Sequence, residues 1–355
     1  MSTVHEECLG KLAYAWPRLD ARATARSEPE DFIVEERLGF DPAGQGEHVL
    51  LHVCKRGLNT DQVARALARH ADVKRVSIGF AGLKDRHAVT SQYFSVHLPG
   101  ISEQAEPDWT ALNSTQLKVL SATRHTRKLR RGGLIGNAFR LCLREVQGDP
   151  DVITERPQCV SESGAPNYFM DQRFGHQCNN LARADEMLLQ GKRIRDRHMR
   201  GIYLSSARSW LFNLVLSARI DADNWNSALE GDSYMLDQSR SCFQVDNIDE
   251  TLQTRLAGLE VHPTGPLWGR GRSLVDGRAA LLEEQALAEW EGWKSGLEMV
   301  GLDMARRRLR MRVAGLEWTW PDSDRLELSF SLQPGSYATA VLRELISTNE
   351  PGRIA

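Results

Sequence analysis

Apolar and polar positions alternate along several segments of the first third of the chain, and this pattern predicts β-strands. The clearest case is residues 138–146, where Phe139, Leu141 and Leu143 occupy every second position. Related patterns predict three further strands, at residues 47–56, 91–98 and 116–125. The first third is therefore expected to contribute several strands of a sheet.

Helical spacing appears in the first third and dominates the middle of the chain. Residues 59–71 begin with Asn-Thr and place Val63 and Leu67 one turn apart, which predicts a helix. Residues 205–220 begin with Ser and carry a dense apolar stripe, which predicts a helix. Residues 279–293 have an amphipathic pattern, which predicts another. The middle of the chain is therefore expected to be more helical than the start.

The end of the chain returns to the pattern of the first third. Residues 325–333 alternate strictly, and residues 334–346 turn through Pro-Gly into a predicted helix. Residues 148–166 are rich in turn formers and poor in periodic apolar positions, so we expect a domain boundary there. A length of 355 residues suits about two domains. We therefore expect the C-terminal segment to pack on the N-terminal domain and the middle to be an insertion.

Composition narrows the functional class only slightly. Apolar residues make up 41% and charged residues 26% of the chain, as in globular proteins, and no apolar run has membrane-spanning length. The start lacks a signal-peptide core, so a cytoplasmic protein is the simplest interpretation. The six cysteines form no CxxC pair, and P-loop, HExxH and GxSxG motifs do not occur. We expect neither a metal ion nor a cofactor.

The distribution of charge says more than the net charge of −2. Basic residues gather in three clusters, at residues 124–131, 192–200 and 306–312. One such cluster is usually a solvated face, but three in a nearly neutral chain favour a basic surface that faces a polyanion.

The stretch GFAGLKDRHAVTSQYFSV, residues 79–96, places Lys, Asp, Arg and His in a row after a glycine turn. An aspartate in such a turn is most often simply solvated. The alternative is that Asp85 is presented into a cleft to do chemistry.

Residues 81–96 resemble the signature of the TruD family of tRNA pseudouridine synthases, which modify uridine 13. Five further segments resemble family segments in the same order, at residues 27–60, 127–139, 164–175, 204–213 and 332–346. The resemblance covers nearly the whole chain. It implies an α/β (α+β) pseudouridine synthase catalytic domain on a mainly antiparallel sheet, built from residues 1–163 and 312–355 and interrupted by a TRUD insertion domain at 164–311.

The resemblance also implies the reaction. The N1 glycosidic bond of uridine breaks, the base rotates, and C5 rejoins the ribose, with tRNA as the partner and with no membrane and no protein partner required. The protein is expected to act as a monomer. By resemblance Asp85 is the essential aspartate, either as a nucleophile on C1′ or C6 or as the base that removes a proton from C2′.

An ionised Asp85 in a pocket that excludes water needs a neighbouring cation. The family places a basic residue, often Lys, shortly before the PEDF motif, and Arg26 stands there in this chain. Lys84 would point the opposite way if its segment were a strand, so Arg26 is favoured.

The target base must be flipped out of a folded tRNA and held in a slot. The resemblance assigns this slot to Phe32, Asn137, its neighbour Phe139, and Tyr337, where the family usually has Phe. From the residues alone, ordinary core packing is the favoured explanation of Phe32 and Phe139.

Two other functional classes remain open. A non-catalytic RNA-binding or RNA-chaperone module would use the basic surface alone, and the intact GLKDRHAVTSQ motif argues against it. A metal-dependent RNA-processing hydrolase would need carboxylates clustered near Asp85, and the absence of such a cluster from the sequence opposes this class. For the favoured enzyme, residues 164–311 should form the second wall of an RNA-binding cleft, with the clusters at 192–200 and 306–312 on phosphates.

Overall fold

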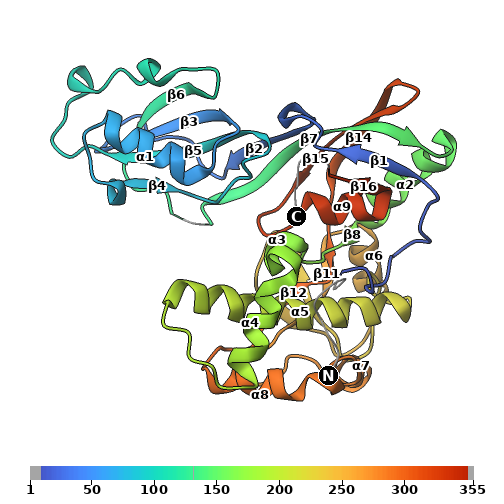
Figure 1. Cartoon of the computed structure of the whole chain (residues 1–355). Coiled ribbons are helices and arrows are strands. Elements are labelled where there is room, and N and C mark those ends of the chain that lie inside the picture. Colours follow the sequence, from blue (N-terminus) through green and yellow to red (C-terminus); the bar gives the residue numbers. More distant parts are fainter. Residues whose placement is uncertain (1–8, 131, 351–355) are drawn as a thin grey trace.

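A large, mainly antiparallel sheet organises the protein in the computed structural model, which describes residues 9–130 and 132–350 (Figure 1). Within these residues the sheet has ten strands. Its main path runs, in spatial order, through β14 (Ala314–Asp322), β15 (Arg325–Leu332), β7 (Leu134–Gln147), β2 (Phe32–Leu38), β5 (Val89–His97), β3 (His48–Arg56) and β6 (Leu117–His125). Three short strands lie off this path: β1 (Arg22–Ala25), which pairs with β7, β16 (Ser347–Asn349), which pairs with β1, and β4 (Ile78–Phe80), which pairs with β5. The expected α/β fold with a mainly antiparallel sheet is confirmed.

Strand β7 is the axis of this sheet. It pairs antiparallel with β2, β15 and β1, so segments from the two ends of the sequence lie side by side (Figure 1). Phe139, Leu141 and Leu143 of β7 are buried, as their alternation predicts. Only the pairs β2–β5 and β1–β16 are parallel in the described part of the chain.

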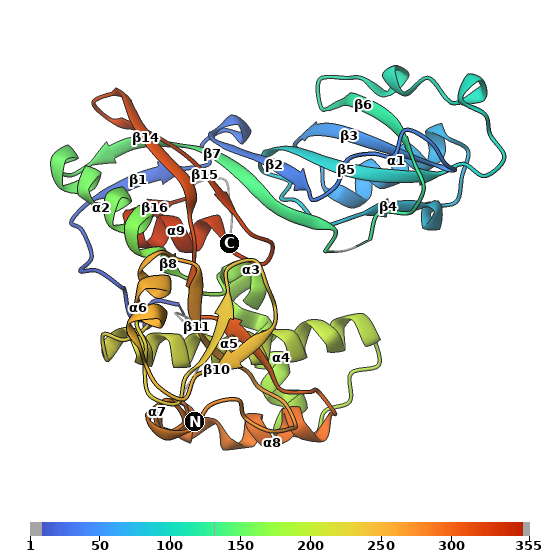
Figure 2. The same ribbon diagram turned by 180° about the vertical axis from the view of Figure 1, so that it is seen from behind.

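Helix α1 (Thr60–His70) packs against the far end of the sheet, beside β3, β4 and β5 (Figures 1 and 2). Asn59 begins it with a capping box, because its side chain accepts from the amide of Gln62 while the Gln62 side chain accepts from the amide of Asn59. Val63 and Leu67 are fully buried. The predicted helix at 59–71 and the strands predicted at 47–56, 91–98, 116–125, 138–146 and 325–333 are confirmed to within a few residues.

The segment expected to be an irregular boundary begins with a helix, α2 (Pro150–Ser163). The side chain of Asp149 accepts a hydrogen bond from the amide of Asp151, and Pro150 occupies the first helical position, where its missing N–H is harmless. Ile153 and Val160 are buried beneath β14 and the C-terminal helix α9 (Ala338–Leu345). The turn formers at the beginning of this segment therefore start a helix, and the domain boundary expected there stays a prediction.

A second part of the molecule lies beneath the sheet and is mostly helical (Figures 1 and 2). Its helices are α3 (Asp171–Phe174), α4 (Asn179–Leu188), α5 (Arg197–Asp221), α6 (Glu250–Ala257), α7 (Gly277–Ala286) and α8 (Glu291–Met299). Its strands β9 (Ser233–Leu236), β10 (Cys242–Gln244), β11 (Val261–Leu267) and β12 (Ala305–Arg308) form a four-stranded sheet, and β8 (Ala165–Pro166) pairs with β13 (Arg310–Met311). Single 3-10 turns occur at Pro29–Asp31, Arg75–Ser77, Glu103–Ala105, Trp109–Leu112, His176–Cys178 and Ala288–Trp290.

Two predicted helices of this part differ from the observed ones. Helix α5 begins eight residues before the predicted start, because the Asp196 side chain accepts from the amides of His198 and Met199 and caps it. The helix predicted at 279–293 is broken into α7 and α8 by a 3-10 turn. The break lets α8 turn its own apolar face, with Trp293, against α4, where the indole donates to Asp185.

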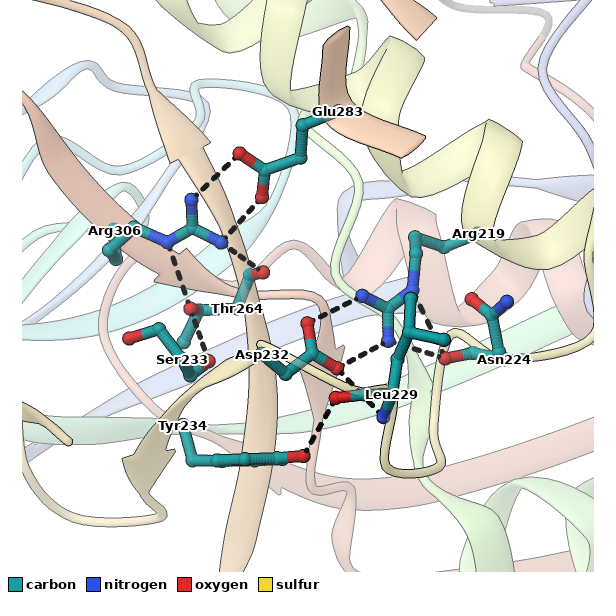
Figure 3. A network of polar contacts seen from close by, with 9 residues as sticks. All are labelled: Arg219, Asn224, Leu229, Asp232, Ser233, Tyr234, Thr264, Glu283 and Arg306. Carbon is teal, nitrogen blue, oxygen red and sulfur yellow. Dashed lines mark hydrogen bonds and ion pairs between the residues drawn. The ribbon is translucent and has the colours of Figure 1, made fainter. Parts of the chain in front are cut away.

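Two buried ion pairs join the elements of this part (Figure 3). Arg219 of α5 forms a bidentate pair with Asp232, and both side chains are almost fully buried. Arg306 of β12 forms a second bidentate pair with Glu283 of α7 and also contacts Thr264 of β11 (Figure 3). Removing one partner of such a pair would be strongly destabilising, because it would leave the other charge buried and unpaired.

Candidate active site

A cleft of about 1210 Å³ lies between the sheet and the helical part below it. All six residues predicted for the site line this cleft: Arg26, Phe32, Asp85, Asn137, Phe139 and Tyr337. The sheet side supplies five of them from β2, from β7, from the loop after β4 and from the residue that follows β1, and Tyr337 stands just before α9. The opposite wall is formed by residues of α3, α4 and α5. The structure thus brings together residues that are more than 300 positions apart in sequence.

Asp85 lies in a loop between β4 and β5, not in a strand. Its side chain is 40% exposed and reaches the cleft, where the Arg26 guanidinium Nη2 stands 3.3 Å from its Oδ2. Gln172 of α3 donates from Nε2 to the same oxygen at 3.2 Å. In the free protein the carboxylate is therefore accessible, and the dry environment expected around it requires that a substrate cover the cleft.

Arg26 is held in an unusual backbone conformation. Its φ of 57° lies in the left-handed region, which is sparsely populated for residues other than glycine. The side chain is only 8% exposed, its guanidinium lies 3.8 Å from the centroid of the Phe32 ring, and Glu350 is a second anionic partner at 3.6 Å. These contacts hold the guanidinium of Arg26 beside the Asp85 carboxylate.

Lys84 does not neutralise Asp85, although the reason differs from the predicted one. The segment is a loop, and the Lys84 ammonium forms an ion pair with the buried carboxylate of Glu36. The other oxygen of Glu36 accepts from the amide of Tyr93 in β5. Lys84 therefore fastens the Asp85 loop to the sheet.

The aromatic residues of the cleft divide into two kinds. Phe32 and Phe139 belong to the core, with 4% and 8% of their surface exposed. Their rings pack edge to face, with 6.2 Å between the ring centroids. The Arg26 guanidinium covers one face of the Phe32 ring. Tyr337 is half-buried at the turn before α9, with its ring 6.0 Å from that of Phe169. Of the three, Tyr337 is the most accessible.

Asn137 of β7 has an unused hydrogen-bond acceptor in the cleft. Its Oδ1 is buried and has no hydrogen-bond partner among the described residues. Because an unpaired buried acceptor is unfavourable, such an atom is suited to a ligand that brings a donor.

Arg307 supports the Tyr337 turn from below and was not singled out by the sequence. Its guanidinium donates to the carbonyl of Gly335 at 3.0 Å and to that of Asn167, and it lies 4.0 Å from the Phe169 ring centroid. Burial lowers the pKa of this guanidinium to about 9. In the sequence Arg307 is one of several arginines in the basic cluster at residues 306–312, and no motif distinguishes it from the others.

The three basic clusters differ in exposure. Residues 192–200 are largely exposed, and Arg197 and His198 at the start of α5 line the cleft. Most arginines of residues 306–312 point inward: Arg306 and Arg310 are buried in hydrogen bonds and Arg308 binds Asp237 and Gln333. The prediction that this cluster grips phosphates was therefore wrong. In residues 124–131, Arg124 is buried against Glu106, and position 131 lies outside the described residues.

Two negative observations apply to residues 9–130 and 132–350. They contain no group of three or more His, Cys, Asp or Glu side chains placed to hold a metal ion. None of their helices combines the length and the apolar character that a membrane span requires.

Comparisons with known proteins agree over the whole chain. The sequence profile of the family described as tRNA pseudouridine synthase D (TruD) matches residues 8–195 and 178–345. The chain is 47% identical over 352 residues to the tRNA pseudouridine synthase D of Methylococcus capsulatus, covering 99% of both chains. It is 48% identical over 341 residues to that of Nitrosococcus oceani, covering 96% of this chain and 94% of the relative.

The fold has a solved counterpart. A crystal structure from Methanosarcina mazei, described as a putative tRNA pseudouridine synthase D, superposes with a TM-score of 0.72 over 96% of this chain and 97% of that one, at 22% identity. At that identity the likeness concerns the fold. Together with the profile and the close relatives, it shows that the chain belongs to the TruD family of tRNA pseudouridine synthases, a family of isomerases.

Proposed function

We propose that this protein isomerises uridine 13 of tRNA to pseudouridine and that Asp85 is its catalytic aspartate. The observation that carries this proposal is the Asp85–Arg26 pair, with 3.3 Å between Oδ2 and Nη2, inside a cleft that Asn137 and Tyr337 also line. An accessible carboxylate beside a fixed cation is what the chemistry at the ribose or at C6 requires.

The cleft residues have distinct roles in this proposal. The flipped uracil stacks on Tyr337, and the unpartnered Oδ1 of Asn137 accepts a hydrogen bond from uracil N3–H. Asp85 then either attacks C1′ or C6 or removes the C2′ proton, and Arg26 keeps it ionised once RNA has displaced water from the cleft. Both routes end when C5 bonds to C1′ and C5 releases its hydrogen.

The two walls of the cleft suggest how the tRNA is held. We propose that residues 1–163 and 312–355 form the catalytic domain and that residues 164–311 form the insertion domain, which supplies the opposite wall. Gln172 already reaches Asp85 from that side, and the exposed arginines at 192–200 are placed to contact phosphates at the rim. In this proposal the protein acts as a cytoplasmic monomer, without metal ion, cofactor or protein partner.

The reaction can be measured by its released hydrogen. A tRNA transcript labelled with tritium at C5 of uridine should release about one equivalent of tritium per tRNA, and the same transcript with cytidine at position 13 should release none. Release that persists in the cytidine-13 transcript would contradict the proposed position. Binding of tRNA without any release would favour the non-catalytic RNA-binding module instead.

A further inference from the structure

The loop that carries Asp85 rests on a layer of buried polar side chains. Lys55 and Gln92 are 0% exposed and Thr60 is 1% exposed. Thr60 accepts from the amide of Lys84 at 2.9 Å and donates to Gln92, whose own amide donates to the carbonyl of Gly82. The backbone on either side of Asp85 is therefore held from below by side chains that the proposed reaction does not use.

Lys55 is the charged member of this layer. It lies near the end of β3, and its Nζ donates to the carbonyl oxygen of Asp85 at 2.8 Å and to that of Leu58 at 2.7 Å. Within the described residues its ammonium forms no ion pair with a carboxylate, whereas Lys84 is paired with Glu36. A buried positive charge is thus satisfied by peptide oxygens alone, and one of these belongs to the proposed catalytic residue.

The buried ammonium group of Lys55 is unfavourable for folding, which points to a use for its charge other than stability. Burying an ammonium group against neutral acceptors carries a desolvation penalty, and an unbranched apolar side chain would fill the same space without it. Desolvation lowers the pKa of Lys55 to about 8, the Asp85 charge opposes that shift, and the like charge of Lys84 adds to it. Cys54 and Glu36 act in the same direction as Asp85.

We propose that Lys55 is a positioning residue for Asp85, and this inference rests on the proposed function of Asp85. Its ammonium fixes the peptide carbonyl of Asp85, so that the carboxylate faces Arg26 and the cleft. Its positive charge also favours the ionised carboxylate once RNA has excluded water. Asp85 is therefore held between two cations, Arg26 at its carboxylate and Lys55 behind its backbone.

The inference predicts opposite pH trends for turnover and for stability. Lys55 is charged below about pH 7 and loses its proton as the pH rises through about 8 in the folded protein, compared with 10.5 for the ordinary side chain. The turnover that depends on this charge should therefore decline above about pH 8. Because the unfolded chain holds this proton up to higher pH, the Lys55 contribution to the free energy of unfolding rises over the same range. Alkaline unfolding would instead lower both.

The test compares Lys55→Met, which removes the charge, with Lys55→Arg, which keeps it at every accessible pH. Lys294→Met is the matched control, since Lys294 is also mostly buried but lies in α8 and is paired with Glu291. Single-turnover tritium release at saturating enzyme is measured from pH 6.5 to 9.5, together with tRNA affinity and thermal melts.

We expect Lys55→Met to lower the single-turnover rate of the bound complex roughly 10- to 100-fold at pH 7, as for a displaced catalytic group. The affinity for tRNA should be nearly unchanged. The decline above about pH 8 should be present in the wild type and in the Lys294 control. It should be absent in Lys55→Met and in Lys55→Arg.

A wild-type rate that stays constant from pH 7 to 9.5 would overturn the inference, and this measurement needs no variant to fold. So would a Lys55→Met protein that melts lower but turns over at the wild-type rate and with the wild-type pH profile. Asp85→Asn is assayed alongside: if it is inactive while Lys55→Met is unaffected, only the role of Lys55 fails. If Asp85→Asn is active, the proposed function itself fails.

Discussion

Replacing Arg26 by Met should slow pseudouridine formation strongly while leaving the fold nearly as stable as before. Met keeps an unbranched apolar side chain beside the Phe32 ring but removes the guanidinium, which is the group that lies 3.8 Å from the ring centroid. The change therefore isolates the cation that stands 3.3 Å from the Asp85 carboxylate. Arg26→Lys, which keeps a positive charge without the planar fork, is the matched variant.

The expected magnitude depends on whether RNA covers the pair. At 3.3 Å the Coulomb energy is about 1.3 kcal/mol in bulk water and about 5 kcal/mol at an effective dielectric constant near 20, before desolvation is subtracted. Asp85 is 40% exposed in the free protein, so the pair contributes there about 0–1 kcal/mol, as exposed pairs do. Under bound RNA a charge-assisted contact is worth about 1.5–3 kcal/mol. That corresponds to a rate loss of roughly 10- to 150-fold.

Single-turnover tritium release measures this loss, and urea unfolding measures stability in parallel. The free energy of unfolding should change by no more than about 1 kcal/mol, because the exposed ion pair and the cation–π contact are both weak. Arg26→Lys should lose less activity than Arg26→Met. Equal rates in Arg26→Met and the wild type would refute the assignment of this cation to Asp85. A loss of activity that only follows a loss of folded protein would do so as well.

Three further predictions concern the slot, the rim and acid stability. Tyr337→Ala should slow turnover of bound tRNA by about 1–3 kcal/mol of lost stacking while Tyr337→Phe stays near the wild type, and equal losses in single-turnover assays would show that the hydroxyl matters instead. Charge reversal of Arg195 and Arg197 together should weaken the binding of all tRNAs. The slope of log affinity against log salt concentration should fall by about one unit for each lost phosphate contact. An unchanged slope in binding titrations would show that these arginines are merely solvated. The free energy of unfolding should fall as the pH drops below 6.5, because burial lowers the pKa of His262 in the folded protein and the unfolded chain therefore takes up the proton first. His262→Gln should flatten this pH dependence in denaturant titrations.

Local patterns were sufficient for elements whose periodicity agrees with their packing. Strand β7 and helix α1 bury the apolar positions that predicted them. The failures occurred where a cap or a tertiary contact decides the outcome. Asp149-Pro150 starts a helix within a segment that is otherwise rich in turn formers, and the Trp293 contact with Asp185 requires the break before α8. A single sequence does not show such partners.

The candidate site was predictable as a set of residues but not as a geometry. The GLKDR motif and its resemblance led to Asp85 and Arg26, which the structure brings into contact. The sequence did not point to Lys55, Gln172 or Arg307. Each of them donates a hydrogen bond to a carbonyl or carboxylate oxygen of a residue far away in the sequence, and such a contact leaves no local pattern. The arginines of residues 306–312 were singled out by the sequence as a basic surface, yet most of them point inward. Buried carboxylate and carbonyl oxygens accept their hydrogen bonds there.

The central claim is that Asp85 performs the chemistry, and the most direct measurement is single-turnover tritium release by Asp85→Asn with tRNA affinity measured on the same preparation. The control is Asp322→Asn, which changes an exposed aspartate in β14 that is paired with Arg325, away from the cleft. The account predicts that Asp85→Asn binds tRNA about as tightly as the wild type and releases no tritium, while the control behaves as the wild type. Tritium release by Asp85→Asn at a rate comparable to that of the wild type would contradict it.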